Sequence, residues 1–195
     1  MPDAPAGALR DWLGSRRAVA VFGASAAPPG TELYRIAQRA GARLADAGFV
    51  VLSGGYGGVM EAASRGAREA GGTAIGVTTP LFASPANRWL HREWSAPDLW
   101  DRTRVLVDAA AGYLVLAGSA GTLAEAAFLW ALQRAGQLGC RPVVLAGPPW
   151  SDVLPVLRRA ELVGADALTA TEVAADVDAA VDRLVALLGP PPPAR

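Results

Sequence analysis

Two glycine-rich segments have the composition of an anion-binding turn. The first reads Ser-Gly-Gly-Tyr-Gly-Gly over residues 53–58, and the second reads Gly-Ser-Ala-Gly-Thr over residues 118–122. Glycines allow backbone N–H groups to approach an anion, and a following helix adds free N–H groups and the positive end of its dipole. Glycine fills four of the five positions from Gly54 to Gly58, more than one turn needs, so this segment predicts phosphate binding. The alternative is a tight turn whose glycines only satisfy backbone geometry.

Glu125 is the candidate catalytic carboxylate. It precedes the apolar residues at 128, 129 and 132 by three, four and seven positions, so it shares their face of a predicted helix. A carboxylate that leans towards the interior or a cleft needs a partner or a purpose. The alternative is a capping box, in which Thr122 caps the helix and Glu125 occupies the third helical position.

Arg102 is the candidate catalytic cation. It lies four, seven and eight positions before Leu106, Ala109 and Ala110, which form the predicted buried stripe of a helix. An arginine on such a stripe needs an anion or a carboxylate as partner. The alternative is that its aliphatic stem follows apolar surface while its head reaches water.

The residue types that are missing exclude several kinds of active site. All 18 basic residues are arginine, so the chain has no lysine for a pyridoxal-phosphate Schiff base or a P-loop. His91 is the single histidine, which excludes a zinc site with several His or Cys ligands, and we predict no metal. Cys140 is the single cysteine, so no internal disulfide forms. Neither glycine segment has the Gly-x-Gly-x-x-Gly spacing of dinucleotide-binding proteins.

Composition and charge narrow the class of protein. The chain has 195 residues, 52% of them hydrophobic and 18% charged, which fits one globular domain. Eighteen basic residues balance eighteen acidic ones, so we expect neither nucleic acid nor an anionic membrane as a partner. No apolar run approaches the ~20 residues that span a bilayer, and the N-terminus lacks a secretory-signal pattern. With the single cysteine, this predicts a cytoplasmic protein.

Apolar runs alternate with helical patterns along the chain. We expect strands at 17–23, 49–52, 73–77, 112–117 and 142–146, an extended piece at 167–170, and helices at 31–47, 59–70, 98–111, 121–135, 151–160 and 172–188. The segment 78–97 has no clear period and is expected to form a long functional or mobile loop. The alternation predicts an α/β fold: a single-domain, Rossmann-like, doubly wound parallel sheet with ligands at the carboxyl ends of its strands. We place a leader with a short helix at 1–16, the domain at 17–188 and a proline-rich tail at 189–195.

These motifs together resemble the Lonely Guy (LOG) family, whose members were long labelled lysine decarboxylases. The resemblance rests on VFGASA (21–26), SGGYGGVMEAASRGAREAGG (53–72), Arg102 and GSAGTLAE (118–125), with Arg102 placed 23 residues before Glu125 as in the family. It covers about residues 17–188. The sequence departs from the family pattern at Glu61, Thr103 and Ser119, and these changes are closer to a branch that also resembles molybdenum-cofactor carrier proteins.

The resemblance implies a homodimer that binds a small phosphorylated nucleotide, AMP or a cytokinin-type nucleotide, and hydrolyses its N-glycosidic bond to a free base and ribose 5-phosphate without a cofactor. Arg102 and Glu125 would form the catalytic pair. The expected phosphate- and ligand-binding residues are Ser25, Gly54, Gly55, Gly57, Gly58, Met60, Gly118, Ser119, Gly121 and Thr122. The alternative is a binder without catalysis, such as a carrier of molybdenum cofactor or a nucleotide sensor.

Overall fold

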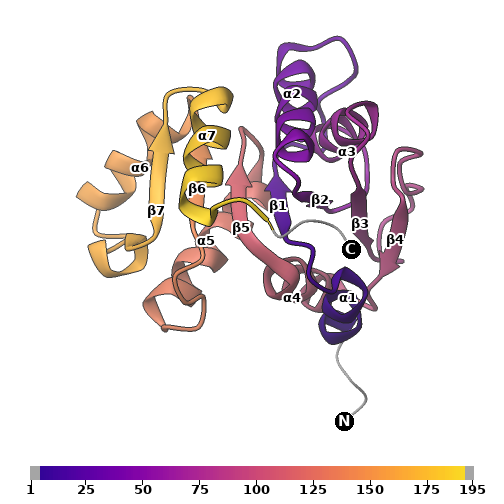
Figure 1. Ribbon diagram of the computed structural model, residues 1–195. Helices are drawn as coiled ribbons and strands as arrows, with labels where there is room; N and C mark the ends of the chain where they lie inside the picture. Colours follow the sequence, from indigo (N-terminus) through magenta and orange to yellow (C-terminus); the bar gives the residue numbers. More distant parts are fainter. Residues whose placement is uncertain (1–4, 192–195) are drawn as a thin grey trace.

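Seven parallel strands form one sheet at the centre of the protein (Figure 1). The structure, a computed structural model, describes residues 5–191. The strands are β1 (Ala18–Phe22), β2 (Val50–Ser53), β3 (Ala74–Thr78), β4 (Arg92–Ser95), β5 (Ala110–Val115), β6 (Val143–Ala146) and β7 (Thr171–Ala174). Their order across the sheet is β4-β3-β2-β1-β5-β6-β7. The predicted single-domain, Rossmann-like α/β fold is confirmed.

Helices cover both faces of the sheet. The helices α2 (Glu32–Asp46), α3 (Val59–Glu69) and α7 (Val177–Leu188) pack on one face. On the other face lie α1 (Pro5–Leu13), α4 (Leu99–Ala109), α5 (Ala120–Arg134) and α6 (Trp150–Arg159). A short 3-10 helix, Ala165–Leu168, precedes β7. Within residues 5–191, no helix is long and apolar enough to cross a bilayer.

The central strand β1 is apolar along its whole length because helices cover the sheet on both sides. Every residue of β1 is buried, and its side chains alternate between two cores. Val19 and Val21 belong to the core beneath α2, α3 and α7, whereas Ala20 and Phe22 belong to the core beneath α1, α4 and α5. The period-two alternation of a strand therefore joins the two helical layers through one buried sheet.

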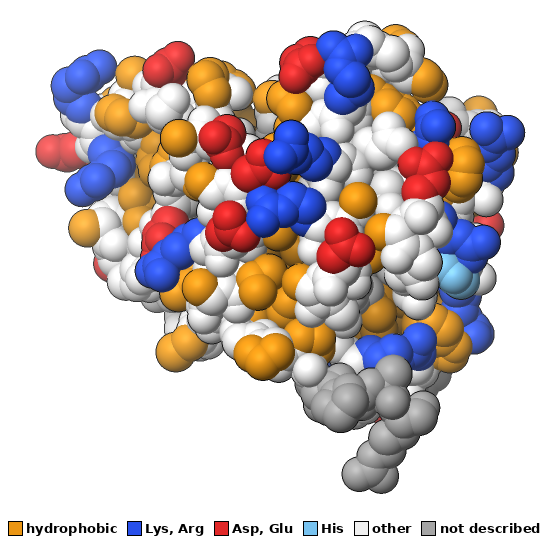
Figure 2. Space-filling view, turned by 45° about the horizontal axis from the view of Figure 1, so that its top comes forward, with side chains coloured by type: hydrophobic (Ala, Val, Ile, Leu, Met, Phe, Trp, Pro, Cys, Tyr) orange, Lys and Arg blue, Asp and Glu red, His pale blue; other side chains and the backbone are white. Residues whose placement is uncertain are grey.

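Side-chain caps and ion pairs fix the helices. The Thr31 hydroxyl accepts a hydrogen bond from the N–H of Tyr34, and the Asp98 carboxylate accepts one from the N–H of Asp101, so each side chain caps the start of its helix. Basic side chains of α2 meet acidic side chains of α7, where Figure 2 shows red and blue atoms side by side: Arg39 with Asp178, and Arg43 with Asp178 and Asp182. Such exposed pairs each contribute little to stability, but together they orient α7 against α2.

The structure differs from the sequence prediction at both edges of the sheet. The segment expected to be a long loop contains β4, whose residues are mostly exposed because one side of the strand has no neighbour. Near the C-terminus the extended piece lies at Thr171–Ala174 instead of 167–170, and α7 begins at Val177 instead of 172. Edge strands lack the continuous apolar run of buried strands, so periodicity did not reveal them. The expected leader at 1–16 contains α1, which begins at Pro5. Residues 1–4 of that leader and residues 192–195 of the expected tail at 189–195 lie outside the described residues.

The direction of the chain reverses at the middle of the sheet. From β1 the chain continues through β2 and β3 to β4, and then returns to β5 on the other side of β1. The turns that follow β1 and β5 therefore leave the sheet on opposite faces, towards α2 and α5. In open α/β sheets this switch point is where ligands bind.

Candidate functional site

The strand order brings three turns together at the carboxyl edge of the sheet. The turn after β1 lies between the glycine-rich turns after β2 and β5. Two hydrogen bonds hold the three together: the N–H of Ala24 donates to Ala117 O (3.1 Å), and the N–H of Val59 donates to Ala24 O (2.8 Å). Ser25, also in the turn after β1, is exposed beside them. The segments predicted to bind the ligand are therefore neighbours.

The first glycine turn is filled by the protein itself. A Cβ atom at Gly54 would overlap the Arg102 guanidinium and the Met60 sulfur, so glycine is required here to make room for side chains. Gly58 has a φ of 68°, and a Cβ there would overlap the carbonyls of Ala24 and Ser25. Both glycines are thus explained by close packing.

Some N–H groups of this turn remain free. Among the residues that the structure describes, those of Gly57, Gly58 and Met60 form no hydrogen bond, whereas the N–H of Gly55 bonds to the Ser53 hydroxyl (3.2 Å). However, Gly55, Gly58 and Met60 are buried, and only Gly57 is partly exposed. The turn therefore offers an anion little open surface.

The second glycine turn is open. Ser119 is the N-cap of α5, its hydroxyl forms no capping hydrogen bond, and the helix begins at Ala120. The N–H groups of Ala120, Gly121 and Thr122 have no partner within the described residues. A Cβ at Gly121 would meet nothing within 4 Å. This helix start can accept an anion on free N–H groups at its positive end.

The capping-box alternative for Thr122 and Glu125 is wrong. Because α5 begins one residue earlier than predicted, Thr122 lies inside its first turn and does not cap it. The Thr122 side chain is buried, and it occupies the space where a Cβ of Gly118 would lie. Glu125 is therefore free of a capping role, and its position needs another explanation.

Arg102 is a buried cation without a carboxylate partner in the described part of the chain. Only 6% of it is exposed. Its Nε donates to Val77 O (2.8 Å), Nη2 lies 3.8 Å from the Met60 sulfur, and the guanidinium lies 5.6 Å from the centre of the Tyr56 ring. Burial lowers the pKa of Arg102, while the charge of Glu125 raises it. A guanidinium is a strong base, so Arg102 remains charged and carries its positive field into the site.

Glu125 interacts with the charge of Arg102 but forms no hydrogen bond or ion pair with it. The partly buried carboxylate forms no hydrogen bond and no ion pair within residues 5–191. Burial raises the pKa of Glu125 to about 7, although the charge of Arg102 lowers it. A carboxyl group with a pKa near neutrality exchanges protons readily at physiological pH, which suits acid–base chemistry.

Tyr56 and Asn87, which were not predicted as site residues, join the 79–90 segment to the first glycine turn. The Tyr56 hydroxyl bonds to both backbone groups of Thr79, and the Asn87 amide donates to Gly55 O and Tyr56 O. Phe82 of the same segment packs against Tyr56. The one available signal was the tyrosine within a run of glycines, which is larger than an anion-binding turn requires.

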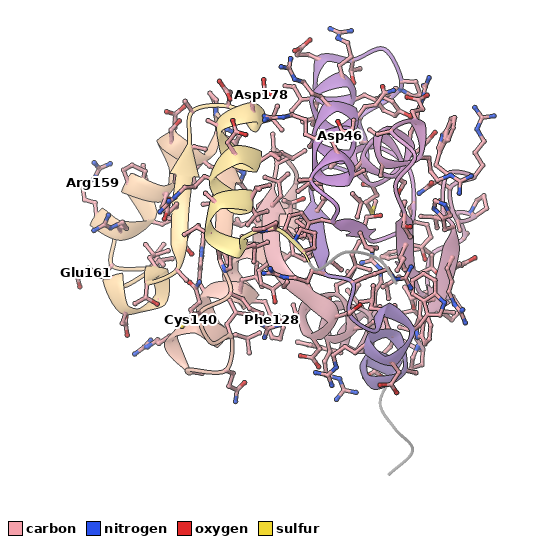
Figure 3. The ribbon with its side chains drawn as sticks, in the orientation of Figure 1. Asp46, Phe128, Cys140, Arg159, Glu161 and Asp178 are labelled. Carbon is pink, nitrogen blue, oxygen red and sulfur yellow. The ribbon has the colours of Figure 1, made fainter. Side chains whose placement is uncertain are left out.

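Four other side chains could take part in chemistry or stack on a ligand: those of His91, Cys140, Trp89 and Trp94. His91 accepts a hydrogen bond from the N–H of Ala74, and burial lowers its pKa. Cys140 is exposed at the end of the sheet opposite the start of α7, as the labels of Figure 3 show. Trp89 and Trp94 each stack with arginine side chains. In the described part of the chain, no group of three or more His, Cys, Asp or Glu residues could hold a metal ion.

Two cavities in the protein do not contain the predicted catalytic pair. One, of about 630 Å³, lies between α6 and β7, and the other, of about 520 Å³, lies at the starts of α2 and α7. The second shares Ala117 with the turn after β5, but neither is lined by Arg102 or Glu125. The candidate site is therefore defined by its charged side chains and by the free N–H groups at the start of α5.

The chain matches the SLOG cluster4 family (LDcluster4) over residues 16–140. The protein belongs to this family. The matched segment contains both glycine turns, Arg102 and Glu125. The resemblance to LOG-like proteins drawn from the sequence is confirmed.

This SLOG cluster4 protein is similar in sequence to proteins named phosphoribohydrolases and similar in structure to a protein named a molybdenum cofactor carrier. The cytokinin riboside 5′-monophosphate phosphoribohydrolase of Mycobacterium marinum is 34% identical over 145 residues, which are 69% of this chain and 72% of that protein. The protein of the same name from Mycobacterium tuberculosis is 31% identical over 150 residues, which are 71% of this chain and 72% of that protein. The molybdenum cofactor carrier protein from Chlamydomonas reinhardtii superposes with a TM-score of 0.68 at 26% identity, covering 89% of this chain and 98% of that one.

Proposed function

We propose that this SLOG cluster4 protein is a phosphoribohydrolase that cleaves the N-glycosidic bond of a nucleoside 5′-monophosphate, AMP or a cytokinin-type nucleotide. The observation that carries this proposal is Glu125: within residues 5–191 its carboxyl has no ion-pair partner, the charge of the buried Arg102 acts on it, and burial raises its pKa to about 7. A residue held in this state at the edge of an anion-binding helix start is typical of a catalytic acid or base.

The open turn binds the 5′-phosphate in this proposal. The N–H groups of Ala120, Gly121 and Thr122 and the Ser119 hydroxyl contact the phosphate oxygens, and Ser25 and Gly57, which lie beside each other, complete the contacts. Binding the phosphate away from the reacting bond helps to position that bond over Glu125. The remaining predicted residues of the first turn, Gly54, Gly55, Gly58 and Met60, support the site through packing, and Gly118 makes room for Thr122.

The two charged side chains carry the chemistry. Cleavage of the C1′–N bond develops positive charge on the ribose, as in glycoside hydrolysis. Glu125, as the carboxylate, stabilises that charge or takes a proton from the attacking water. Arg102 orients Glu125 or stabilises negative groups of the ligand. Water adds to C1′, and the base leaves with the electrons of the broken bond and takes up a proton.

The comparisons support this reaction through the mycobacterial relatives, which are named phosphoribohydrolases at 31–34% identity. The second candidate is a carrier without catalysis. The observation that favours it is the molybdenum cofactor carrier of Chlamydomonas reinhardtii, which matches at 26% identity over 98% of its length. A carrier uses the same phosphate-binding turn but does not need a carboxyl with a pKa near 7.

One experiment separates the two candidates. Purified protein is incubated with AMP, and adenine and ribose 5-phosphate are measured by chromatography. For the hydrolase we expect adenine to form about a hundredfold faster than with Glu125→Gln, which removes the ionisable group. Glu172→Gln, the same change on β7 where Glu172 pairs with Arg183, serves as the matched control and keeps the rate. Thermal stabilisation by AMP with no adenine above the Glu125→Gln level would leave only a binder without catalysis, either a carrier or a nucleotide sensor.

The assembly and location are part of the same proposal. We propose a cytoplasmic homodimer with its domain at residues 17–188 and no nucleic acid or membrane partner. Leu99 and Trp100, at the start of the helix that bears Arg102, support a dimer because they are 47% and 80% exposed. Exposed apolar side chains that lie together often mark a protein interface. Light scattering after size exclusion measures the mass, and Trp100→Arg is expected to shift it towards the monomer.

A further inference from the structure

An aromatic pair lies against Arg102 on the side of the first glycine turn. The rings of Tyr56 and Phe82 meet edge to face, with 5.4 Å between their centres and an angle of 89° between their planes. The Arg102 guanidinium lies 5.6 Å from the centre of the Tyr56 ring and 6.0 Å from that of Phe82. Both distances are within the range of cation–π attraction. Two rings from different segments therefore hold one buried cation.

The segment that carries Phe82 is fixed by hydrogen bonds. The Tyr56 hydroxyl donates to Thr79 O (2.7 Å) and accepts from the Thr79 N–H (2.8 Å). The Asn87 side chain donates to Gly55 O (3.0 Å) and to Tyr56 O (3.1 Å). Both ends of the 79–87 segment are thus attached to the first glycine turn, and Phe82 is held in place between them.

Packing alone does not account for Phe82. Tyr56 is 7% exposed, whereas Phe82 is 46% exposed and its neighbour Leu81 is 65% exposed. A phenylalanine that served only to cover Tyr56 and Arg102 would gain more by burying its own second face. Instead, nearly half of Phe82 remains open to solvent beside a buried positive charge, although its segment is held in place.

We propose that the exposed face of Phe82 is a subsite for the planar heteroaromatic base of the ligand, with Tyr56 and Arg102 as its support. This inference rests on the proposed function, since it assigns the base of the same nucleotide. Any of the nucleic-acid bases can stack on an aromatic side chain, because every base has a π-face. The nearby guanidinium favours a ring that is electron-rich and presents hydrogen-bond acceptors at its edge.

The subsite completes a binding surface for three parts of a nucleotide. The start of α5 receives the phosphate, Glu125 and Arg102 interact with the ribose and the reacting bond, and Phe82 receives the base. Arg102 connects these parts because it contacts the Phe82 ring and its charge acts on Glu125. Ribose 5-phosphate, which has no base, would occupy all of the surface except Phe82. That difference provides the test.

Calorimetric titration measures the Kd of AMP and of ribose 5-phosphate, with every variant built on Glu125→Gln to prevent turnover. We expect Phe82→Ala to raise the Kd of AMP about tenfold, in line with base–aromatic stacking, and to leave the Kd of ribose 5-phosphate unchanged. Phe82→Tyr retains an aromatic face and is expected to restore AMP binding. Leu81→Ala, the matched control, removes a neighbouring exposed side chain and is expected to change neither Kd more than about twofold, as for a surface position.

Each contrary result has a definite meaning. An unchanged AMP Kd in Phe82→Ala overturns the subsite, while AMP cleavage by the wild type would still support the proposed function. Equal weakening of both ligands also overturns it, because Phe82 would then act through the fold or the phosphate site. A lower oligomer mass in Phe82→Ala, measured by light scattering, assigns the ring to a subunit interface instead. If AMP binds with a Phe82-dependent Kd but is never cleaved, the subsite stands and the hydrolase fails.

Discussion

The two glycine-rich turns have similar compositions and opposite structures. In the turn after β2, the space beside Gly54 and Gly58 is occupied by Arg102, Met60 and backbone carbonyls. In the turn after β5, the space beside Gly121 is open and the first N–H groups of α5 have no partner in the described chain. One turn makes room for the protein, and the other leaves room for a ligand.

The difference shows that a glycine count does not identify a phosphate site. Glycine is selected wherever two groups approach closely, whether the second group is an anion or a buried side chain. The first turn has more glycines, yet its main role in the structure is to seat the Arg102 guanidinium against Gly54. The second turn has fewer, but it combines exposure, free N–H groups and a partly buried carboxyl.

The largest expected effect breaks the first turn. Gly58→Ala places a Cβ against the backbone carbonyls of Ala24 and Ser25 at a φ of 68°, so we expect the free energy of unfolding to fall by about 3 kcal/mol, as for an overpacked and strained position. Chemical denaturation measures this change. Gly121→Ala is the matched control, since the new Cβ meets no atom within 4 Å and lies in a helix, where alanine is favoured over glycine by up to ~1 kcal/mol. Equal destabilisation by the two substitutions would contradict the packing role of Gly58.

The next largest effect is a change in the pH dependence of stability through Glu125, which follows the second turn. Because burial raises the pKa of Glu125 to about 7 from 4.5, the folded protein holds a proton that the unfolded chain releases between these values. The stability contributed by this proton is complete below about pH 4.5 and is lost as the pH rises through 7. Glu125→Gln removes this dependence. Between pH 5 and pH 8 the wild type should lose about 2 kcal/mol of unfolding free energy that the variant does not lose, so the variant gains that amount relative to the wild type.

Denaturation at several pH values tests this expectation. A stability difference that stays constant from pH 5 to pH 8 would show that Glu125 has an ordinary pKa. The same group predicts a rise in the rate of AMP cleavage as the pH passes through about 7, because the carboxylate is the active form. Arg102→Met removes the positive charge that lowers the pKa of Glu125, so it should move this rise to higher pH.

The fold was largely predictable from the sequence because buried parallel strands form continuous apolar runs. The five inner strands, β1, β2, β3, β5 and β6, were recognised from such runs. Of the two edge strands, β4 was missed and β7 was placed a few residues too early. An edge strand such as Arg92–Ser95 pairs through its backbone, and its side chains need not be apolar. An apolar run therefore predicts that a strand is buried, but the lack of such a run does not exclude a strand that pairs at the edge of a sheet.

The site was predictable only where its signal was local. The helical spacing around Glu125 and Arg102 correctly indicated that both lean towards the interior. The reason for a glycine at position 54 could not be found in this way. The Arg102 guanidinium that occupies the space beside it belongs to α4, which is far away along the chain. The same holds for Phe82, which reaches the site only because Tyr56 and Asn87 attach its segment. These contacts depend on the tertiary fold.

A smaller effect should appear in ligand binding at the second turn. Gly121→Ala puts a methyl group where an anion would approach the N–H groups of α5, while the fold accommodates it. We expect the Kd of AMP to rise about tenfold, the loss of roughly one good hydrogen bond to a charged group. Titration of the variant with AMP measures this. Unchanged affinity would show that the phosphate does not bind at the start of α5.

The smallest effect distinguishes a capping serine from a binding serine. Ser119 is the N-cap of α5 but forms no capping hydrogen bond, so Ser119→Ala should lower the stability by less than about 0.5 kcal/mol. Asp98→Ala, at the N-cap of α4, removes a 2.8 Å hydrogen bond to the N–H of Asp101 and should lower it by about 1 kcal/mol. If Ser119 instead contacts the phosphate, its loss will appear as weaker AMP binding. A stability loss equal to that of Asp98→Ala, with AMP affinity intact, would make Ser119 a structural cap and remove it from the proposed site.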